Sequence, residues 1–180
     1  MILAWHLVWT AYGWWFPNDP RGAWSQEVWK PALRVLGKVE QRGRRRVQPT
    51  AEELQAWLKG AQKRLKHAAV VLDDRACEIV REAIREQAEL HRYVILALAV
   101  LPRHVHIVVD RHAHRYERMV QAFKSVSSRR LRRYFGLTAL QGKAAKRVPI
   151  WARGYWVRYL DTKEAVESAV RYVNRHITAV

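Results

Sequence analysis

Four short segments of the chain combine apolar runs with the aromatic and β-branched residues that are typical of β-strands. These segments are residues 2–12, 92–102, 104–110 and 155–160. Only a few residues around Pro102 separate the second segment from the third, so we expect these two to form a tight antiparallel hairpin. The first segment carries Trp5 and Trp9 at alternate positions, which predicts that both tryptophans point into the core.

Four longer segments repeat apolar residues at helical spacing. They cover residues 50–67, 73–91, 115–136 and 161–176. Thr50 precedes Glu53 by three residues, which is the spacing of a capping box at the start of a helix. Asp161 precedes Glu164 in the same way and is the expected N-cap of the last helix. The order of these elements predicts an α+β fold, a mainly antiparallel sheet with helices packed on it, in one domain of residues 1–180.

The chain is strongly basic, with 33 Lys and Arg against 16 Asp and Glu, which gives a net charge of +17. Because such an excess of charge repels itself, we expect a polyanionic partner: nucleic acid first, a membrane surface second. No run of about 18 uncharged apolar residues occurs, which argues against a membrane-spanning helix. The single cysteine, Cys77, cannot form a disulfide within the chain, and this is typical of a reducing cytoplasm.

Basic residues gather in two segments that are candidates for contacts with phosphates. The candidates are Arg42, Arg44, Arg45 and Arg46 in one segment, and Arg129, Arg130, Arg132 and Arg133 in the other. The first segment belongs to a basic loop around residues 26–50. In another loop, Trp14, Trp15 and Trp24 are candidates for stacking on unpaired bases. Solvated charged faces, and a loop packed onto the domain, remain the alternatives.

Two histidines lie one residue apart in the third predicted strand, in the stretch HVHIVVD. Alternate residues of a strand share a face and lie about 6.5 Å apart, so His104 and His106 point to one side while the core-forming valines and isoleucine point to the other. Two imidazoles at this distance are able to bind one divalent ion. Spacing alone slightly favours the alternative, in which both are hydrogen-bonded structural histidines, and a metal site also needs a third ligand. A second pair, His112 and His114, lies in a basic turn and is explained adequately by a solvated loop.

The last predicted helix offers such a ligand. Tyr172 and His176 are four residues apart and share one face of the helix. Ala165 and Ala169 continue that face and are expected to leave space above it. The neighbouring stripe, expected to pack on the sheet, consists of Val166, Val170, Val173 and Ile177. The helix would thus present a hydroxyl nucleophile beside a metal ligand, although an ordinary amphipathic contact of Tyr172 fits the helical spacing as well.

Three features together resemble the HUH single-tyrosine transposases, especially the REP-associated and insertion-sequence 200-like transposases. They are the strand motif His104-Val105-His106, the helix motif YVNRH that begins at Tyr172, and the strongly basic small domain. The stretches HLVWTAYGWWFPNDPRGAWS and WARGYWVRYLD also resemble members of this family, so the resemblance spans nearly the whole chain. Two features depart from the family: His176 stands where Gln or Asn is common, and segment 26–50 looks like an insertion.

The resemblance implies a ferredoxin-like or RRM-like fold with the histidine strand near the centre of the sheet. It implies that Tyr172 attacks a phosphodiester of single-stranded DNA, with or without a hairpin, and forms a 5′-phosphotyrosine link. His104, His106 and His176 would hold a divalent ion, Mg²⁺ or Mn²⁺, of which Mn²⁺ suits nitrogen ligands better. The protein would act as a monomer or homodimer, away from membranes, in the bacterial cytoplasm near the nucleoid.

Two other functions remain open. A non-cleaving nucleic-acid-binding regulator derived from such a transposase would keep the basic surface without the chemistry. A metal-dependent phosphohydrolase would use water in place of tyrosine, but its site is usually richer in carboxylates, and only Asp110 lies near the histidines. Other tyrosines compete for the role of nucleophile: Tyr116, Tyr134, Tyr155 and Tyr159. Among them all, only Tyr172 has a potential metal ligand one helical turn away.

Overall fold

The protein is an α+β structure, seen in a computed structural model that describes residues 1–23, 28, 31–37, 39, 43–137 and 148–178. Contacts divide the chain into two compact units. The first consists of Met1–Ala11 and Val70–Val180, and the second of Tyr12–Ala69. The segment 26–50, which the family resemblance suggested as an insertion, falls within the residue range of the second unit.

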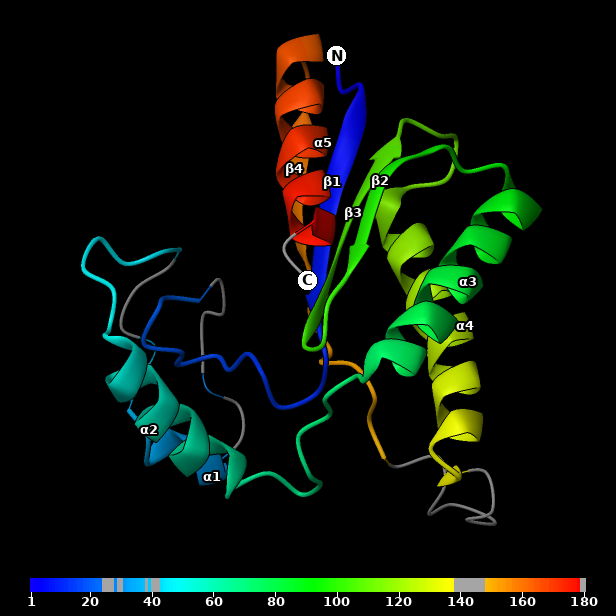
Figure 1. The fold of residues 1–180 in the computed structure, drawn as a ribbon. Coiled ribbons are helices and arrows are strands. Elements are labelled where there is room, and N and C mark those ends of the chain that lie inside the picture. The colour runs from blue at the N-terminus through cyan, green and yellow to red at the C-terminus, as the bar shows by residue number, and fades with distance from the viewer. Residues whose placement is uncertain (24–27, 29–30, 38, 40–42, 138–147, 179–180) are drawn as a thin grey trace. The chain divides into compact units, whose positions relative to one another are not determined.

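Four strands form one antiparallel sheet in the first unit, in the order β2-β3-β1-β4. Their bounds are β1 Ala4–Thr10, β2 Ile95–Val100, β3 His104–Asp110 and β4 Trp156–Leu160. The predicted hairpin of β2 and β3 is confirmed, and β3 is one of the two inner strands (Figure 1). In this register Val8 of β1 lies opposite His106 on one side and opposite Trp156 on the other. Strand β1 is therefore the direct neighbour of the histidine strand.

Two long helices cover one face of this sheet (Figure 1). They are α3, Asp74–His91, and α4, Tyr116–Tyr134. Val105, Ile107 and Val109 of β3 point to this face and are completely buried, as the alternation predicted. Trp9 of β1 is buried as well and stacks on Phe123 of α4, with ring centroids 6.5 Å apart. Burial of each large apolar side chain contributes about 1.5–3 kcal/mol to the free energy of folding. The buried side chains on this face therefore form a core between the sheet and the two helices.

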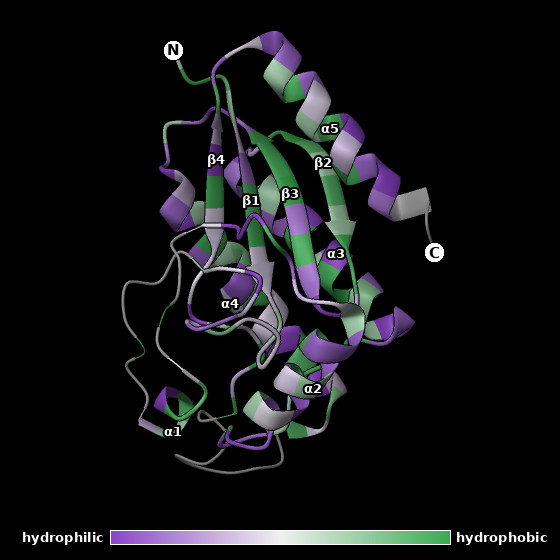
Figure 2. Ribbon diagram, turned by 90° about the vertical axis from the view of Figure 1, so that its left-hand side faces the viewer, coloured by the Kyte–Doolittle hydropathy of each residue, from purple (hydrophilic) through white to green (hydrophobic). Residues whose placement is uncertain are grey.

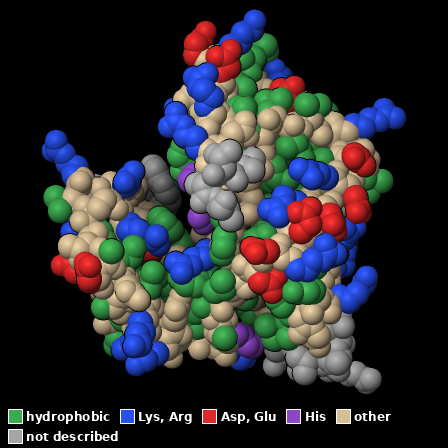
Figure 3. Space-filling model, in the orientation of Figure 1, with side chains coloured by type: hydrophobic (Ala, Val, Ile, Leu, Met, Phe, Trp, Pro, Cys, Tyr) green, Lys and Arg blue, Asp and Glu red, His purple; other side chains and the backbone are tan. Residues whose placement is uncertain are grey.

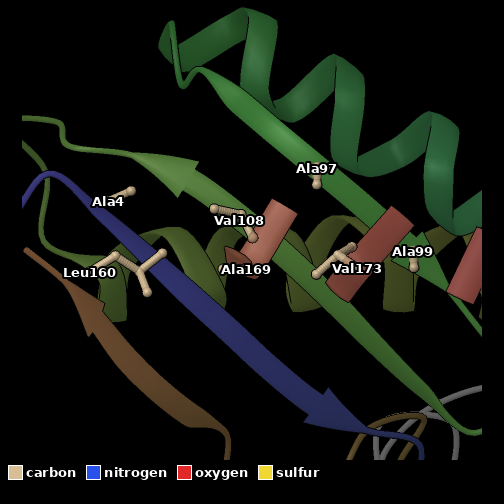
Figure 4. Packing of buried hydrophobic residues seen from close by; sticks show 7 residues of the cluster. All are labelled: Ala4, Ala97, Ala99, Val108, Leu160, Ala169 and Val173. Atoms are coloured by element: carbon tan, nitrogen blue, oxygen red, sulfur yellow. The ribbon is translucent and has the colours of Figure 1, made fainter. Parts of the chain in front are cut away.

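The C-terminal helix α5, Lys163–Thr178, packs on the opposite face of the sheet (Figure 1). Ala169 and Val173 of α5 share a core cluster with mostly small residues of the sheet (Figure 4), namely Ala4, Ala97, Ala99, Val108 and Leu160. The expectation that Ala169 leaves open space beside Tyr172 is therefore wrong, because Ala169 is buried against the sheet. Ile177, which was expected in the packing stripe, lies outside the residues whose side chains are described.

Helix α5 begins one residue later than the sequence predicted. The Oγ1 of Thr162 accepts a hydrogen bond from the N–H of Ala165 at 3.1 Å, which makes Thr162 the N-cap. The prediction of Asp161 as the N-cap is thus wrong; both residues are favourable caps, so composition could not decide between them. Hydrophobic and hydrophilic residues alternate along α5 (Figure 2), as expected of a helix that buries one stripe.

The second unit has a small core of its own and two helices, α1 and α2, which span Pro31–Arg34 and Ala51–Gln62. The predicted capping box of α2 is confirmed, because Thr50 and Glu53 exchange the two hydrogen bonds that define it. The core consists of Phe16, Val28, Leu33 and Ala61. Asn18 links the loops around this core, since its Nδ2 donates to the carbonyls of Leu33 and Gly37, both at 2.9 Å.

Candidate active site

Two histidines of β3 point to the face of the sheet on which α5 lies. The ring centroids of His104 and His106 are 4.9 Å apart, so the predicted shared face is confirmed. His106 is buried, with 7% of its surface exposed, whereas His104, the first residue of the strand, is half-buried. Strand pairing holds the backbone of His106 on two sides, opposite Val8 of β1 and Ala99 of β2, and that of His104 opposite Thr10 of β1.

Helix α5 brings a tyrosine and a third histidine to the same place. The ring of His176 lies nearly parallel to that of His106, with centroids 5.1 Å apart. The ring of Tyr172 lies 5.6 Å from His106 and 4.8 Å from His176. Val173, the residue after Tyr172, is completely buried against the sheet, so the packing of α5 determines where these rings lie. His104, His106, Tyr172 and His176, which the sequence singled out, thus form one cluster.

A fifth side chain of this cluster, His6, was missed by the sequence analysis. His6 lies on β1, and its Nε2 is 3.1 Å from the Nδ1 of His106. Its ring also contacts the ring of Tyr172, at 5.9 Å, and that of Trp156 on β4, at 5.6 Å. The available signal was an ionisable residue in the middle of an apolar strand, on the face opposite to the two core tryptophans. This signal would place His6 beside the histidine motif only if it were already known that β1 pairs with β3.

Burial keeps the two hydrogen-bonded histidines neutral at neutral pH. Desolvation, followed by the charges of the neighbouring histidines, lowers the pKa of His106 to about 3. Desolvation, followed by the charges of Arg158 and His176, lowers the pKa of His6 to about 4. A neutral imidazole keeps one nitrogen lone pair, which is the state that a metal ligand needs.

The donor atoms of the cluster fit a divalent metal ion, although the rings are not arranged as a chelate. The Nε2 of His176 is buried without a hydrogen-bond partner. A buried nitrogen of this kind is expected to have a partner, and a bound metal ion would provide one. His104 and His106 add imidazole nitrogens from a second element. Within the described ranges, however, no three His, Cys, Asp or Glu side chains lie close enough together to hold a metal ion. Metal binding would therefore require at least one of these rings to move from the position seen here.

Asp110 does not join this cluster. It is the last residue of β3, six residues from His104, which corresponds to about 20 Å along a strand. Its Oδ1 accepts a hydrogen bond from the N–H of Arg111 at 2.8 Å. Asp110 was the only carboxylate that the sequence placed near the histidines, and a water-using phosphohydrolase was already disfavoured by this scarcity. In the structure Asp110 lies away from the histidine cluster as well.

The other candidate tyrosines make contacts elsewhere. The hydroxyls of Tyr159 and Tyr116 are hydrogen-bonded to each other at 2.9 Å, and this bond, followed by desolvation, raises the pKa of Tyr116 above its usual range. Tyr155 contacts the ring of Tyr116, and Tyr134 donates to the carboxylate that caps α3. Tyr172, by contrast, is 48% exposed and lies beside the histidines. It combines an accessible side chain with the histidine cluster.

Two of the four predicted phosphate contacts in α4 are engaged within the protein. Arg130 forms a two-bond ion pair with Glu86 of α3. Arg132 donates to a backbone carbonyl at 3.2 Å. Arg129 and Arg133, one helical turn apart, are exposed. Figure 3 shows basic and acidic side chains interleaved over α3 and α4, so this surface is not uniformly basic.

In the second unit, Arg44 and Arg46 are exposed, while the guanidinium of Arg45 donates to the carbonyl of Pro20 at 3.4 Å. Arg42 and Trp24 lie outside the described residues. Their part in DNA binding stays a prediction.

The two described candidate tryptophans of this unit differ in exposure. Trp15 is 43% exposed, and the guanidinium carbon of Arg21 lies 4.4 Å from its ring centroid. Trp14 is half-buried, and its carbonyl accepts a hydrogen bond from Arg21 at 3.3 Å. Trp15 is thus the better placed of the two for stacking on a base.

None of the described helices is both long and apolar enough to cross a bilayer. Cys77 is buried in α3.

Comparisons with known proteins place the chain among relatives. The sequence model of the family described as "Transposase IS200 like" matches residues 63–176, more than half of the chain. The match includes His104, His106, Tyr172 and His176 but not His6. No curated protein matched the sequence.

Two solved structures are reported as similar to the chain at low sequence identity. A candidate transposase from Deinococcus radiodurans R1 is 16% identical, with a TM-score of 0.47 over 98% of this chain and 92% of that chain. A REP-associated tyrosine transposase bound to a REP hairpin is 12% identical, with a TM-score of 0.45 over 98% of this chain and 68% of that chain.

Proposed function

We propose that this chain, which belongs to the IS200-like transposase family, cleaves and rejoins single-stranded DNA with Tyr172 as the nucleophile. One observation carries the proposal: the exposed ring of Tyr172 lies 5.6 Å from the ring of His106 and 4.8 Å from that of His176, on a helix that is packed onto the histidine strand. A side-chain hydroxyl becomes an effective nucleophile when a general base or a metal ion lies beside it, and the histidines next to Tyr172 are able to supply either.

The reaction conserves the number of phosphoester bonds. The phenolic oxygen of Tyr172 loses its proton and attacks the phosphorus of a DNA phosphodiester. A bond forms between this oxygen and phosphorus, and the bond from phosphorus to the 3′ oxygen breaks. The leaving 3′ oxygen takes a proton, which leaves a free 3′-hydroxyl and a 5′-phosphotyrosine. Attack by another 3′-hydroxyl reverses these steps and joins strands without ATP.

His104, His106 and His176 are the residues that would hold a divalent ion. When bound, such an ion stabilises negative charge on the phosphate oxygens. A nitrogen-rich donor set favours Mn²⁺ over Mg²⁺, which prefers oxygen ligands, so we expect both ions to support the reaction and Mn²⁺ to do so better. The depressed pKa of His106 keeps this ligand deprotonated well below neutral pH.

The net charge of +17 supports a polyanionic substrate. Exposed basic residues of both units are candidates for contacts with phosphates: Arg44, Arg46, Arg129 and Arg133. Trp15 is a candidate for stacking on a base. Because phosphate contacts release counterions, we expect DNA affinity to fall steeply as the salt concentration rises.

The test uses a pool of 3′-end-labelled single-stranded and hairpin oligonucleotides, since the 3′ fragment becomes attached to the protein. The full chain is incubated with the pool and Mn²⁺ and analysed on a denaturing protein gel. We expect a labelled protein band that disappears with Tyr172→Phe. Tyr159→Phe is the matched control, because Tyr159 is also 48% exposed but lies in another contact network. It should retain the band.

Two other outcomes would replace the proposal. Cleaved DNA without a labelled protein band would indicate hydrolysis by water. Binding without cleavage would indicate a non-cleaving regulator derived from a transposase.

A further inference from the structure

The hydrogen bond between His6 and His106 joins two buried imidazoles and restricts the tautomers of both. The Nε2 of His6 lies 3.1 Å from the Nδ1 of His106, and the two residues are only 5% and 7% exposed. A neutral imidazole has one N–H and one bare nitrogen. In a hydrogen bond between two neutral imidazoles, one of the two facing nitrogens therefore carries the proton and the other accepts it. The choice of donor decides the state of the other nitrogen of His106.

Only one of the two arrangements leaves His106 able to bind a metal ion through its Nε2. When His106 donates from Nδ1, its Nε2 is bare and has a lone pair to offer. When His6 donates from Nε2 instead, the proton of His106 lies on its own Nε2 and blocks that lone pair. The outer hydrogen bond of a ligating histidine commonly sets its tautomer and orientation in this way.

We propose that His6 is a positioning residue that accepts the Nδ1–H of His106 and thereby keeps the Nε2 of His106 bare for a divalent ion. This inference rests on the proposed function in one respect, namely that His106 is a metal ligand. It goes beyond the family match, which covers residues 63–176 and does not reach β1.

The surroundings of His6 hold its ring in place for this role. Its backbone lies on an inner strand, opposite Val108 of β3 and Arg158 of β4. Its ring makes an edge-to-face contact with Trp156 and lies beside Tyr172, with centroid distances of 5.6 Å and 5.9 Å. Because pairing and packing constrain it on several sides, His6 is a rigid acceptor for His106.

The test measures Mn²⁺ binding to the full chain by the paramagnetic resonance signal of free Mn²⁺, which does not depend on DNA cleavage. His6→Phe keeps a planar ring but removes the acceptor, and we expect it to weaken Mn²⁺ binding about 10- to 100-fold. His6→Gln places an amide oxygen near the position of Nε2 and should stay close to the wild-type affinity. His114→Phe is the control, since His114 is likewise bonded through one ring nitrogen to an aromatic neighbour, Tyr93, at 2.9 Å. Its affinity should not change.

A second measurement decides the matter even if His6→Phe does not fold. Nitrogen-15 spectra of the imidazoles in the metal-free wild-type chain should show His106 protonated at Nδ1 and bare at Nε2. A proton on Nε2 of His106 would overturn the inference, and so would wild-type affinity for Mn²⁺ in a folded His6→Phe variant. Absence of Mn²⁺ binding by the wild type would overturn it as well.

Failure of the proposed function gives a different pattern. If Mn²⁺ binds with the expected dependence on His6 but no DNA becomes linked to Tyr172, the positioning role stands and cleavage by tyrosine does not.

Discussion

Replacement of Val173 by alanine tests whether the packing of α5 determines the geometry of the tyrosine and histidine cluster. Val173 is completely buried between α5 and the sheet and directly follows Tyr172. The substitution removes two buried carbon atoms, which costs about 1.6 kcal/mol at about 0.8 kcal/mol for each. Its neighbours on β2, Ala97 and Ala99, are too short to fill the space, so the remaining cavity raises the loss to about 2 kcal/mol.

The free energy of unfolding is measured by urea denaturation for the wild type, Val173→Ala and Val170→Ala. Val170 belongs to the same helix and contacts the same cluster, but it is only partly buried. The identical truncation at this control position should therefore cost less than about 1 kcal/mol. Equal losses for the two variants would refute the argument that α5 is held mainly through Val173.

The same pair of variants is then compared in the labelled-DNA assay, at a temperature where both are folded. A shift of about 1 Å at a reacting group can reduce a rate about 100-fold. We therefore expect Val173→Ala to form the tyrosine adduct much more slowly than Val170→Ala. An undiminished rate in a destabilised Val173→Ala would show that Tyr172 is positioned by contacts other than the docking of α5.

Two further predictions concern the cap of α5 and the buried histidines. Thr162→Ala should lower the free energy of unfolding by about 1 kcal/mol, and Asp161→Ala by less, because only Thr162 accepts the bond from Ala165; a larger effect at Asp161 in urea denaturation would contradict this assignment. In the metal-free protein, the pKa values of His6 and His106 are about 4 and about 3 in the folded state, below the value near 6.5 in the unfolded state. At a pH between the folded and unfolded values, the unfolded state therefore binds more protons than the folded state. Stability should therefore fall as the pH decreases from about 6.5 to about 4, by at most about 1.4 kcal/mol per pH unit for each histidine, and a flat profile between pH 7 and pH 5 would refute it.

Local patterns in the sequence were sufficient to predict the elements of the first unit and one face of its site. The strand of the histidine motif spans His104–Asp110, as predicted, because alternation of apolar residues is a local property of a strand. The turn at Pro102 similarly predicted the antiparallel hairpin of β2 and β3. Helical spacing placed Tyr172 and His176 on one face, and their rings are 4.8 Å apart. Each of these predictions depends on residues within a few positions of one another.

Other features depended on which distant segments pack together. The sequence offered Arg130 as a phosphate contact, but α3 supplies Glu86 as its partner. It also suggested open space at Ala169, which the sheet fills. Salt bridges and helix docking of this kind join residues far apart in the chain, and a single sequence carries little information about such pairs.

The sequence by itself determined the chemistry that is available: two histidines on one strand face, a tyrosine and a histidine on one helix face, and a charge of +17 that favours a nucleic-acid partner. The tertiary structure decided that these two faces meet, because Val173 docks α5 onto the sheet beside His106. It also decided that His6 joins them, because β1 pairs with β3 and brings one histidine within 3.1 Å of another that is far away in sequence. The alternation of residues along a strand determines which face of the sheet a side chain lies on. Which side chains from other strands lie next to it depends on the order of the strands in the sheet.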